Sequence, residues 1–212
     1  MKSQVYLYTF GAGFLVTFLL YFWFVHSWYF VPFEVWVQGN LLLFSLFLFG
    51  IKVIGIVWPP LPGGLFVLGS VPLIGWINAY LLDFGGTLLG SSIAYILARK
   101  YGMSLVQRIV STELTKKIEK IKVRKERELE TVFLARVLGG AVLVEIVAYA
   151  SGLFRIGYRN FLLGTIASHF LLGIPAYYFF ENIFEGKNIL ISIVSIVALI
   201  FLFTKFKGRY LE

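Results

Sequence analysis

The sequence predicts an all-α polytopic membrane protein. Of its 212 residues, 59% are hydrophobic and 14% are charged, whereas soluble domains average about 45–50% apolar and about 25% charged residues. The mean hydropathy is +0.85. An excess of apolar surface on this scale requires lipid as a second solvent. The chain has no cysteine and two histidines far apart in sequence, so we expect neither a metal site nor a cofactor.

The first element is expected to cross the membrane. Residues 5–25 carry no charge, and 21 residues of helix are long enough for a hydrocarbon layer of about 30 Å. A cleaved signal peptide is the alternative, but the apolar run is long for one and no small-residue cleavage site follows. Residues 26–38 mix aromatic and polar side chains, which is typical of the headgroup level.

Residues 41–75 are expected to form a re-entrant hairpin. Its arms are 41–57 and 65–74, and its tip consists of residues that cannot continue a helix, namely Pro59, Pro60, Pro62, Gly63 and Gly64. The alternative is two simple membrane helices joined by a proline-rich loop in water. The tip has no charge and the second arm is too short to span, so we favour the hairpin.

A full span is expected at 76–98, followed by a hydrophilic segment at 99–130. That segment carries ten basic and five acidic residues, and the positive-inside rule places it in the cytoplasm. Apolar residues at helical spacing predict a basic amphipathic helix on the inner leaflet, where we expect it to bind anionic lipid headgroups. A plain solvated face is the alternative. Because acids are interspersed, nucleic acid is not an expected partner.

The second half is expected to repeat this layout. Residues 132–157 form two short apolar pieces separated by Glu145, with Gly139 and Gly140 at the break. We read them as a second re-entrant hairpin. Spans at 160–180 and 188–204 follow, and the basic residues beyond them place both chain termini in the cytoplasm. We expect the plasma membrane as the location.

A shift of 82 residues aligns 74–97 with 156–179 without a gap, and seven of these twenty-four positions are identical. The two segments are expected to cross the membrane in opposite directions. Inverted repeats with broken helices are typical of alternating-access transporters.

Several motifs extend this pattern. The stretch Pro59-Pro60-Leu61-Pro62-Gly63-Gly64 precedes Gly86-Thr87-Leu88-Leu89-Gly90, and the second half carries Phe133-Leu134-Ala135-Arg136 and Phe161-Leu162-Leu163-Gly164-Thr165. The motif positions also include Gly90, Tyr95, Arg99, Gly102, Tyr149 and Gly152. From about residue 41 to 180, the chain resembles the DedA / SNARE-associated (VTT-domain) membrane proteins as a divergent member.

The resemblance implies two re-entrant hairpins inserted from opposite sides and a role in moving lipids. Bacterial members are similar to undecaprenyl-phosphate flippases, and eukaryotic relatives to phospholipid scramblases. The chain departs from the family where an acidic residue is expected before the tip (54–57), where Ser91 replaces an expected Asp, and where Gly139 and Val142 replace an expected Pro and Arg. The acidic pair of the family and half of its basic phosphate clamp are therefore absent from their usual places.

Five ionisable residues fall inside the apolar segments: Lys52, Asp83, Arg136, Glu145 and His169. Each is costly in lipid and is therefore a functional hypothesis. We expect Arg136, helped by Lys52, to bind a lipid phosphate between the hairpin tips. Glu145 or Asp83 would compete for Arg136 in the empty site, and His169 is a second candidate for proton coupling.

The alternatives for these residues are structural. Arg136 and Glu145 could form a fixed buried ion pair, Lys52 could extend to the membrane surface, and His169 could be a hydrogen-bonded core residue. The predicted function is a lipid flippase or scramblase. The alternatives are an ion- or proton-coupled transporter of a small solute and a non-transporting membrane scaffold. No catalytic constellation indicates an enzyme, and the sequence leaves open whether two copies assemble as a homodimer.

Overall fold

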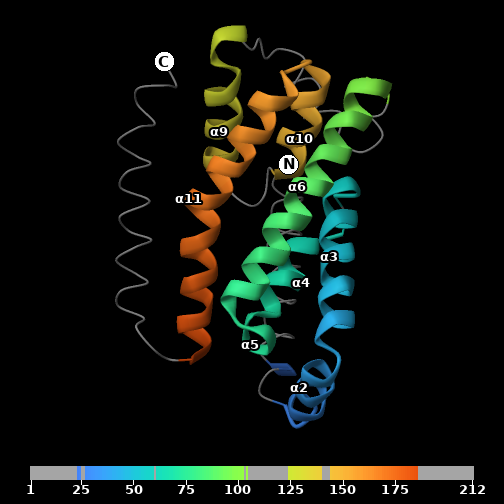
Figure 1. The fold of residues 1–212 in the computed structure, drawn as a ribbon, viewed down its shortest axis with the longest axis vertical. Coiled ribbons are helices and arrows are strands. Elements are labelled where there is room, and N and C mark those ends of the chain that lie inside the picture. The colour runs from blue at the N-terminus through green and yellow to red at the C-terminus, as the bar shows by residue number, and fades with distance from the viewer. Residues whose placement is uncertain are drawn as a thin grey trace, which may run out of the picture. The chain divides into compact units, whose positions relative to one another are not determined.

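The computed structural model describes residues 23–24, 27–59, 61–102, 104, 124–139 and 144–185. The predicted spans at 5–25 and 188–204 lie outside these residues, apart from 23–24, as do Pro60, Gly140 and most of the basic segment. The chain divides into two compact units, Met1–Phe44 and Ser45–Glu212. All described elements are helices (Figure 1).

In the first unit, helix α2 (Phe30–Gly39) contains most of the stretch 26–38 that was expected at the headgroup level. Phe33 packs edge-on against Phe24 and Phe44, with ring centroids 5.6 and 6.0 Å apart. Trp28 is 77% exposed. Exposed tryptophan beside a small aromatic cluster suits an interfacial segment.

Among the described residues of the second unit, two helices are long and apolar enough to cross a membrane, α6 (Trp76–Tyr101) and α11 (Tyr158–Glu185). A third span is counted if α2 and the next helix, α3 (Leu41–Val57), form one broken span. Both long helices exceed the predicted ranges 76–98 and 160–180. Arg99 and Lys100 therefore belong to the last turn of α6 rather than to the basic segment.

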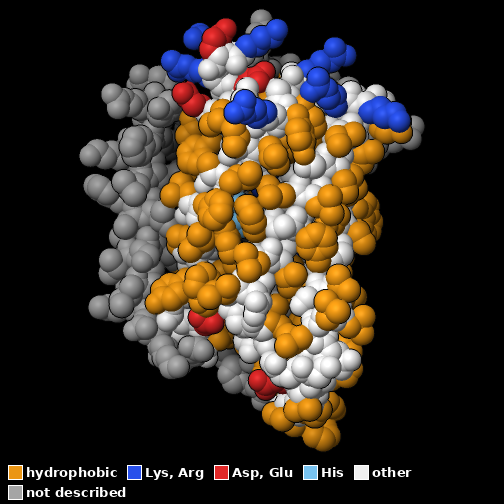
Figure 2. Space-filling view, in the orientation of Figure 1, with side chains coloured by type: hydrophobic (Ala, Val, Ile, Leu, Met, Phe, Trp, Pro, Cys, Tyr) orange, Lys and Arg blue, Asp and Glu red, His pale blue; other side chains and the backbone are white. Residues whose placement is uncertain are grey.

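The polarity of α6 is inverted relative to a soluble helix. Its outward side chains are apolar, with Ile77, Leu81 and Ile96 each more than half exposed, while Asp83 and Thr87 are buried. In water this arrangement would be unfavourable, whereas in lipid it removes polar groups from hydrocarbon. Figure 2 shows the apolar flank, with Lys and Arg side chains gathered at one end of the view.

After α3 the chain reverses at Trp58–Pro62 and continues as α4 (Gly63–Gly69) and α5 (Val71–Ile74). The start of α4 packs closely on α3: a Cβ at Gly63 would lie 2.7 Å from the carbonyl oxygen of Ile51. The prediction that Gly63 and Gly64 belong to the tip was wrong. They begin α4, because Pro62 has a fixed φ next to the helix start and the missing Cβ atoms permit the close approach.

The second hairpin consists of α9 (Glu128–Gly139) and α10 (Val144–Leu153). Gly139 is the last residue of α9 and was predicted to be part of a tip. Glu145 was expected to separate two apolar pieces. It lies in the first turn of α10, where a carboxylate stabilises the N-terminus of the helix. Where either hairpin ends relative to the membrane stays a prediction.

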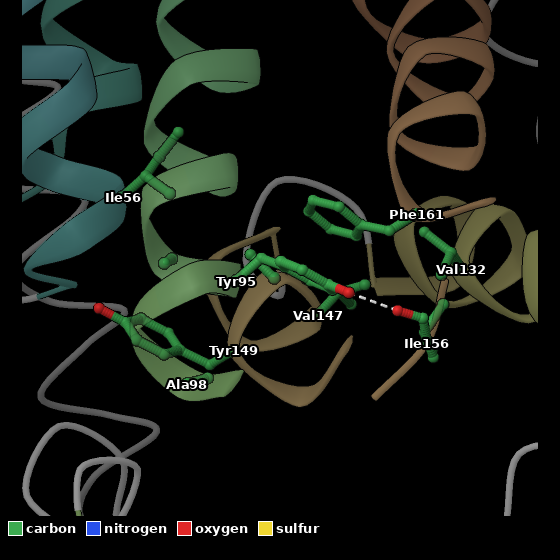
Figure 3. Close-up of a cluster of buried hydrophobic side chains, with 10 residues drawn as sticks. Ile56, Tyr95, Ala98, Val132, Val147, Tyr149, Ile156 and Phe161 are labelled. Carbon is green, nitrogen blue, oxygen red and sulfur yellow. Dashed lines mark hydrogen bonds between the residues drawn. The ribbon is translucent and has the colours of Figure 1, made fainter. Parts of the chain in front are cut away.

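Helix α6 is the central packing element, because α4, α5, α10 and α11 all contact it, and α11 also packs on α9. Figure 3 shows the main apolar cluster around Tyr95 and Phe161, whose rings stack with centroids 4.8 Å apart. The Tyr95 hydroxyl donates a hydrogen bond to the carbonyl of Ile156, which precedes α11. The same hydroxyl accepts a hydrogen bond from Arg99.

The long helices run antiparallel, because contacts join opposite ends. At one end Tyr95 meets Tyr158, and at the other the Trp76 backbone N–H donates to Glu181 at 3.1 Å. Opposed directions are what an inverted repeat requires, although the repeat itself stays a prediction.

The start of α11 is held by Glu128, at the start of α9. The carboxylate of Glu128 accepts hydrogen bonds from the Asn160 amide at 2.8 Å and the Gly157 backbone N–H at 2.9 Å. These two hydrogen bonds, the Asn160 amide first, lower the pKa of Glu128. The stabilisation that they provide is present above the ordinary glutamate pKa and is lost as the pH falls through the lowered value.

We predict that Gly152→Ala strongly destabilises the protein, because a Cβ there would lie 2.2 Å from the backbone oxygen of Tyr95, where α10 crosses α6. The expected loss is about 1–3 kcal/mol or more, which is the typical cost of overpacking. Thermal unfolding in detergent, followed by circular dichroism, measures the change.

The matched control is Gly50→Ala in α3, where a Cβ would meet nothing within 4 Å. This change should be neutral or stabilising by up to about 1 kcal/mol, because alanine is the better helix former. Equal losses in the two variants would contradict the proposed close contact.

Candidate functional site

The candidate site is built around the buried carboxylate of Asp83, in the middle of α6. Its Oδ1 atom lies 2.6 Å from Nζ of Lys52 on α3, and its Oδ2 atom lies 3.0 Å from Nε2 of His169 on α11. The three side chains are each about 10% exposed or less. A single carboxylate thus connects three helices, and the two partners offset part of the cost of burying its charge.

Glycines make room for the lysine. A Cβ at Gly86 of α6 would lie 2.6 Å from Cγ of Lys52, and one at Gly64 of α4 would lie 3.3 Å from its Nζ atom. Larger residues at either position would push the lysine away from Asp83. The glycines therefore allow the stem of Lys52 to pass close to α6 and place its ammonium group beside the carboxylate.

Arg136 on α9 is the second buried cation. It is 3% exposed, and its Nη1 atom has no hydrogen-bond partner among the described residues. Glu145 of α10 and Asp83 both lie close enough to interact electrostatically with Arg136. A buried guanidinium with an unused donor can donate a hydrogen bond to an anionic oxygen at little further desolvation cost.

Aromatic rings pack on one side of Asp83. The ring of Tyr80 lies 5.5 Å from the His169 ring and 5.9 Å from the Tyr177 ring, and Phe84 lies 5.3 Å from His169. Tyr80 and Tyr177 are almost completely buried. These rings exclude water from that side of the carboxylate.

The structure brings together three of the five predicted ionisable residues, Lys52, Asp83 and His169, but in a different pairing. Asp83 was expected to compete for Arg136, whereas its direct contacts are with Lys52 and His169. Lys52 is buried and paired rather than extended to the membrane surface. Sequence reasoning could not choose between the two cations because the choice depends on how α3 packs on α6.

Three buried hydroxyl residues lie near this site: Thr87, Ser91 and Thr165. The shift of 82 residues aligns Asp83 with Thr165 and Thr87 with His169, and these two pairs were expected to line one polar path. Thr87 and Ser91 also follow Asp83 at intervals of four residues, which places all three on one face of α6. The burial of Thr165 depends in addition on the pairing of α6 with α11.

Most of the residues that carried the family resemblance occupy close helix contacts, whereas Gly102 ends a helix in open space. Gly90 meets Ile56 and the backbone of Val53 on α3, and Gly102 ends α6 with a positive φ of 63°. The Tyr149 hydroxyl donates to the last carbonyl of α3, that of Val57, at 2.6 Å. With Tyr95, Arg99 and Gly152, described above, these positions hold the helices together around the charged cluster.

A family model described as the VTT domain matches residues 61–182, which is more than half of the chain. The chain belongs to the VTT-domain family. This is the domain of the DedA / SNARE-associated proteins, as the motifs predicted. Searches of curated proteins and of solved structures find no match.

The VTT domain match runs from the turn before α4 to the end of α11 and includes Asp83, Arg136, Glu145 and His169. Lys52 lies before it. With two helices apolar and long enough to span, this VTT-domain protein is an integral membrane protein.

We predict that Lys52→Met lowers the free energy of unfolding by about 3–5 kcal/mol, which is the usual result of leaving a buried charge without its partner. Asp83→Asn in the same chain should recover part of that loss, because the unpaired charge is then removed. Thermal unfolding of both single variants and the double variant in detergent measures the coupling.

Lys100→Met is the control, since Lys100 is exposed at the end of α6. It should change the stability by less than about 0.5 kcal/mol. Strictly additive losses in the double variant would show that Lys52 and Asp83 do not interact.

Proposed function

We propose that this VTT-domain protein moves a phosphate-bearing lipid, such as a polyprenyl phosphate or a phospholipid, between membrane leaflets. The observation that carries the proposal is Arg136, a buried arginine with an unused donor inside a helical unit whose outer side chains suit lipid. A buried cation is retained at such a place only if anionic groups compensate its charge, and here the nearby carboxylates leave one donor of the guanidinium unused. A lipid phosphate is the anion that the surrounding membrane supplies.

Two cations can hold the phosphate, one from the first helix of each hairpin. Lys52 lies on α3 against Gly86 of α6. On α9, Val132 lies against Gly164 of α11, and Arg136 follows Val132 one turn later. Each cation is thus carried by a hairpin helix that packs on a long helix. A phosphate approaching Lys52 would replace Asp83 as its partner while Arg136 donates to another oxygen.

The charges of the site restrict what can bind. Lys52 and Arg136 carry two positive charges, Asp83 and Glu145 carry two negative charges, and His169 is neutral unless protonated. An anionic headgroup would leave one negative charge without a partner. Protonation of His169 would restore the balance, whereas a zwitterionic headgroup brings its own cation and needs no proton.

The basic end supports an orientation for transport. Exposed basic residues gather there at the ends of α6, α9 and α11, including Arg99, Lys100, Lys125, Arg127, Arg155 and Arg159 (Figure 2). We propose that this end faces the cytoplasm and that it and the segment 99–130 contact anionic headgroups of the inner leaflet. The plasma membrane, cytoplasmic termini and a homodimer remain part of this proposal.

We predict that Arg136→Gln slows lipid movement at least about tenfold, because charge-assisted hydrogen bonds to a charged group contribute about 1.5–3 kcal/mol. Lys52→Gln should also slow it. The assay follows fluorescent phospholipids in proteoliposomes, with dithionite added outside to quench the outer leaflet.

Arg159→Gln, which removes an exposed arginine at the start of α11, should leave the rate unchanged. An unchanged rate in Arg136→Gln would refute the site. If the wild-type protein moves no lipid at all, lipid transport is refuted in favour of solute transport or a scaffold.

The charge balance predicts that the effect of replacing His169 depends on the headgroup. His169→Gln should slow the movement of a phosphatidylglycerol probe, because glutamine cannot take up the proton that would balance the anionic lipid. A phosphatidylcholine probe should respond little.

Titratable groups that also surround Asp83 are Lys52, Tyr80, Arg136, Glu145 and Tyr177. Equal slowing of both probes in His169→Gln, or no slowing of the phosphatidylglycerol probe, would contradict the charge-balance argument.

A further inference from the structure

Four hydroxyl groups are buried without a hydrogen-bond partner among the described residues, one on Tyr80 and three on the small side chains of Thr87, Ser91 and Thr165. Thr87 and Thr165 are 1% and 0% exposed, and Ser91 is 0% exposed. A buried hydroxyl that makes no hydrogen bond costs about 1–3 kcal/mol. Three such groups in one part of a protein call for a ligand that can both donate and accept hydrogen bonds.

The three hydroxyls lie between two contacts of the long helices. Asp83 meets His169, and three turns further along α6 Tyr95 stacks on Phe161 of α11. In an antiparallel pair, a step of four residues forward on one helix corresponds to a step of four backward on the other. Thr87 of α6 is therefore opposite Thr165 of α11, one turn from the Asp83 contact.

Ser91 follows Thr87 by one turn on the same face of α6. The stretch between the two contacts is thus lined by hydroxyls from both long helices. The hydroxyl of the neighbouring Ser168 already donates to the Thr165 carbonyl at 2.9 Å and is not available. Apolar packing around Tyr95 closes the stretch towards the basic end, and Tyr80 and Tyr177 close it beyond Asp83.

We propose that Thr87, Ser91 and Thr165 form a closed hydrated site that binds water molecules beside the Asp83–His169 contact. Water fits because it satisfies hydroxyls in either direction, and an internal water molecule typically makes two to four hydrogen bonds. A lipid tail could satisfy none of them, and an anion would find no positive charge on these three side chains. The site is distinct from the cations that hold the phosphate in the proposed function.

The position of this site gives the water a role. Where the proposed lipid transport requires His169 to take up a proton, water next to the Asp83–His169 contact can deliver it while the aromatic rings keep bulk water out. This role rests on the proposed function, whereas the hydrated site itself does not.

Valine substitutions test the site directly, because valine has the shape of threonine without its hydroxyl. If water is bound, Thr87→Val and Thr165→Val each lose hydrogen bonds and lower the Tm, and the double variant is non-additive because the two share water molecules. If the hydroxyls are dry and unsatisfied, each valine raises the Tm. A raised Tm in both single variants would overturn the proposal.

Thr131→Val provides the matched control. The hydroxyl of Thr131 is exposed and already donates to the Arg127 carbonyl at 2.8 Å. Its replacement should change the Tm little, so a loss confined to positions 87 and 165 identifies the buried site.

X-ray radiolytic footprinting gives a second measurement that does not require a variant to fold. Hydroxyl radicals generated from bound water oxidise neighbouring side chains, so His169 should be oxidised in the wild-type protein despite its burial. Tyr149, fully buried and bonded to Val57, should stay unmodified. Protection of His169 equal to that of Tyr149 would overturn the hydrated site.

The two proposals fail separately. Oxidation of His169 together with an absence of lipid movement would retain the hydrated site and refute transport. Lipid movement that depends on Arg136, together with a dry His169, would retain transport and refute the hydrated site.

Discussion

The buried carboxylate of Asp83 is the interaction around which the second unit is organised. A charged group in the core of a membrane protein is tolerated only where partners offset its desolvation. Here the partners come from two other helices, Lys52 from α3 and His169 from α11. Their contacts fix how α3 and α11 sit against α6, and the small residue Gly86 follows from the need to bring the lysine close.

Lipid as the outer solvent explains the rest of the arrangement. Apolar side chains of α6 face outward, and its polar side chains face α3 and α11. Hydrophobic burial adds little to the association of helices in lipid, so close packing at glycines and polar contacts hold them together. Gly90 and Gly152 provide such packing on two sides of α6. A core of this kind contains both structural hydrogen bonds and unused polar groups, and the proposed transport uses the latter.

The family match describes the helical scaffold, whereas the charged cluster describes the candidate site. Tyr95, Tyr149 and Gly152, which are among the positions that made the family recognisable, lie in helix contacts and explain why the VTT fold persists in this chain. The charged cluster extends beyond the matched region, since Lys52 lies before it whereas Asp83 and His169 lie within it. Membership of the family therefore accounts for the scaffold, while the proposed function depends on the charges that the scaffold positions.

The sequence by itself determined that lipid surrounds the protein, that the protein is helical and where the two long spans lie. It also identified the ionisable residues whose burial in lipid is costly. These depend on composition and on runs of apolar residues, which are local properties of the chain. Only the tertiary structure decided that Asp83 pairs with Lys52 and His169, that Gly63 and Gly64 begin a helix, and that Thr165 is buried opposite Thr87. Each of these depends on which helices meet and in what register, and residues on different helices carry no local signal of their contact.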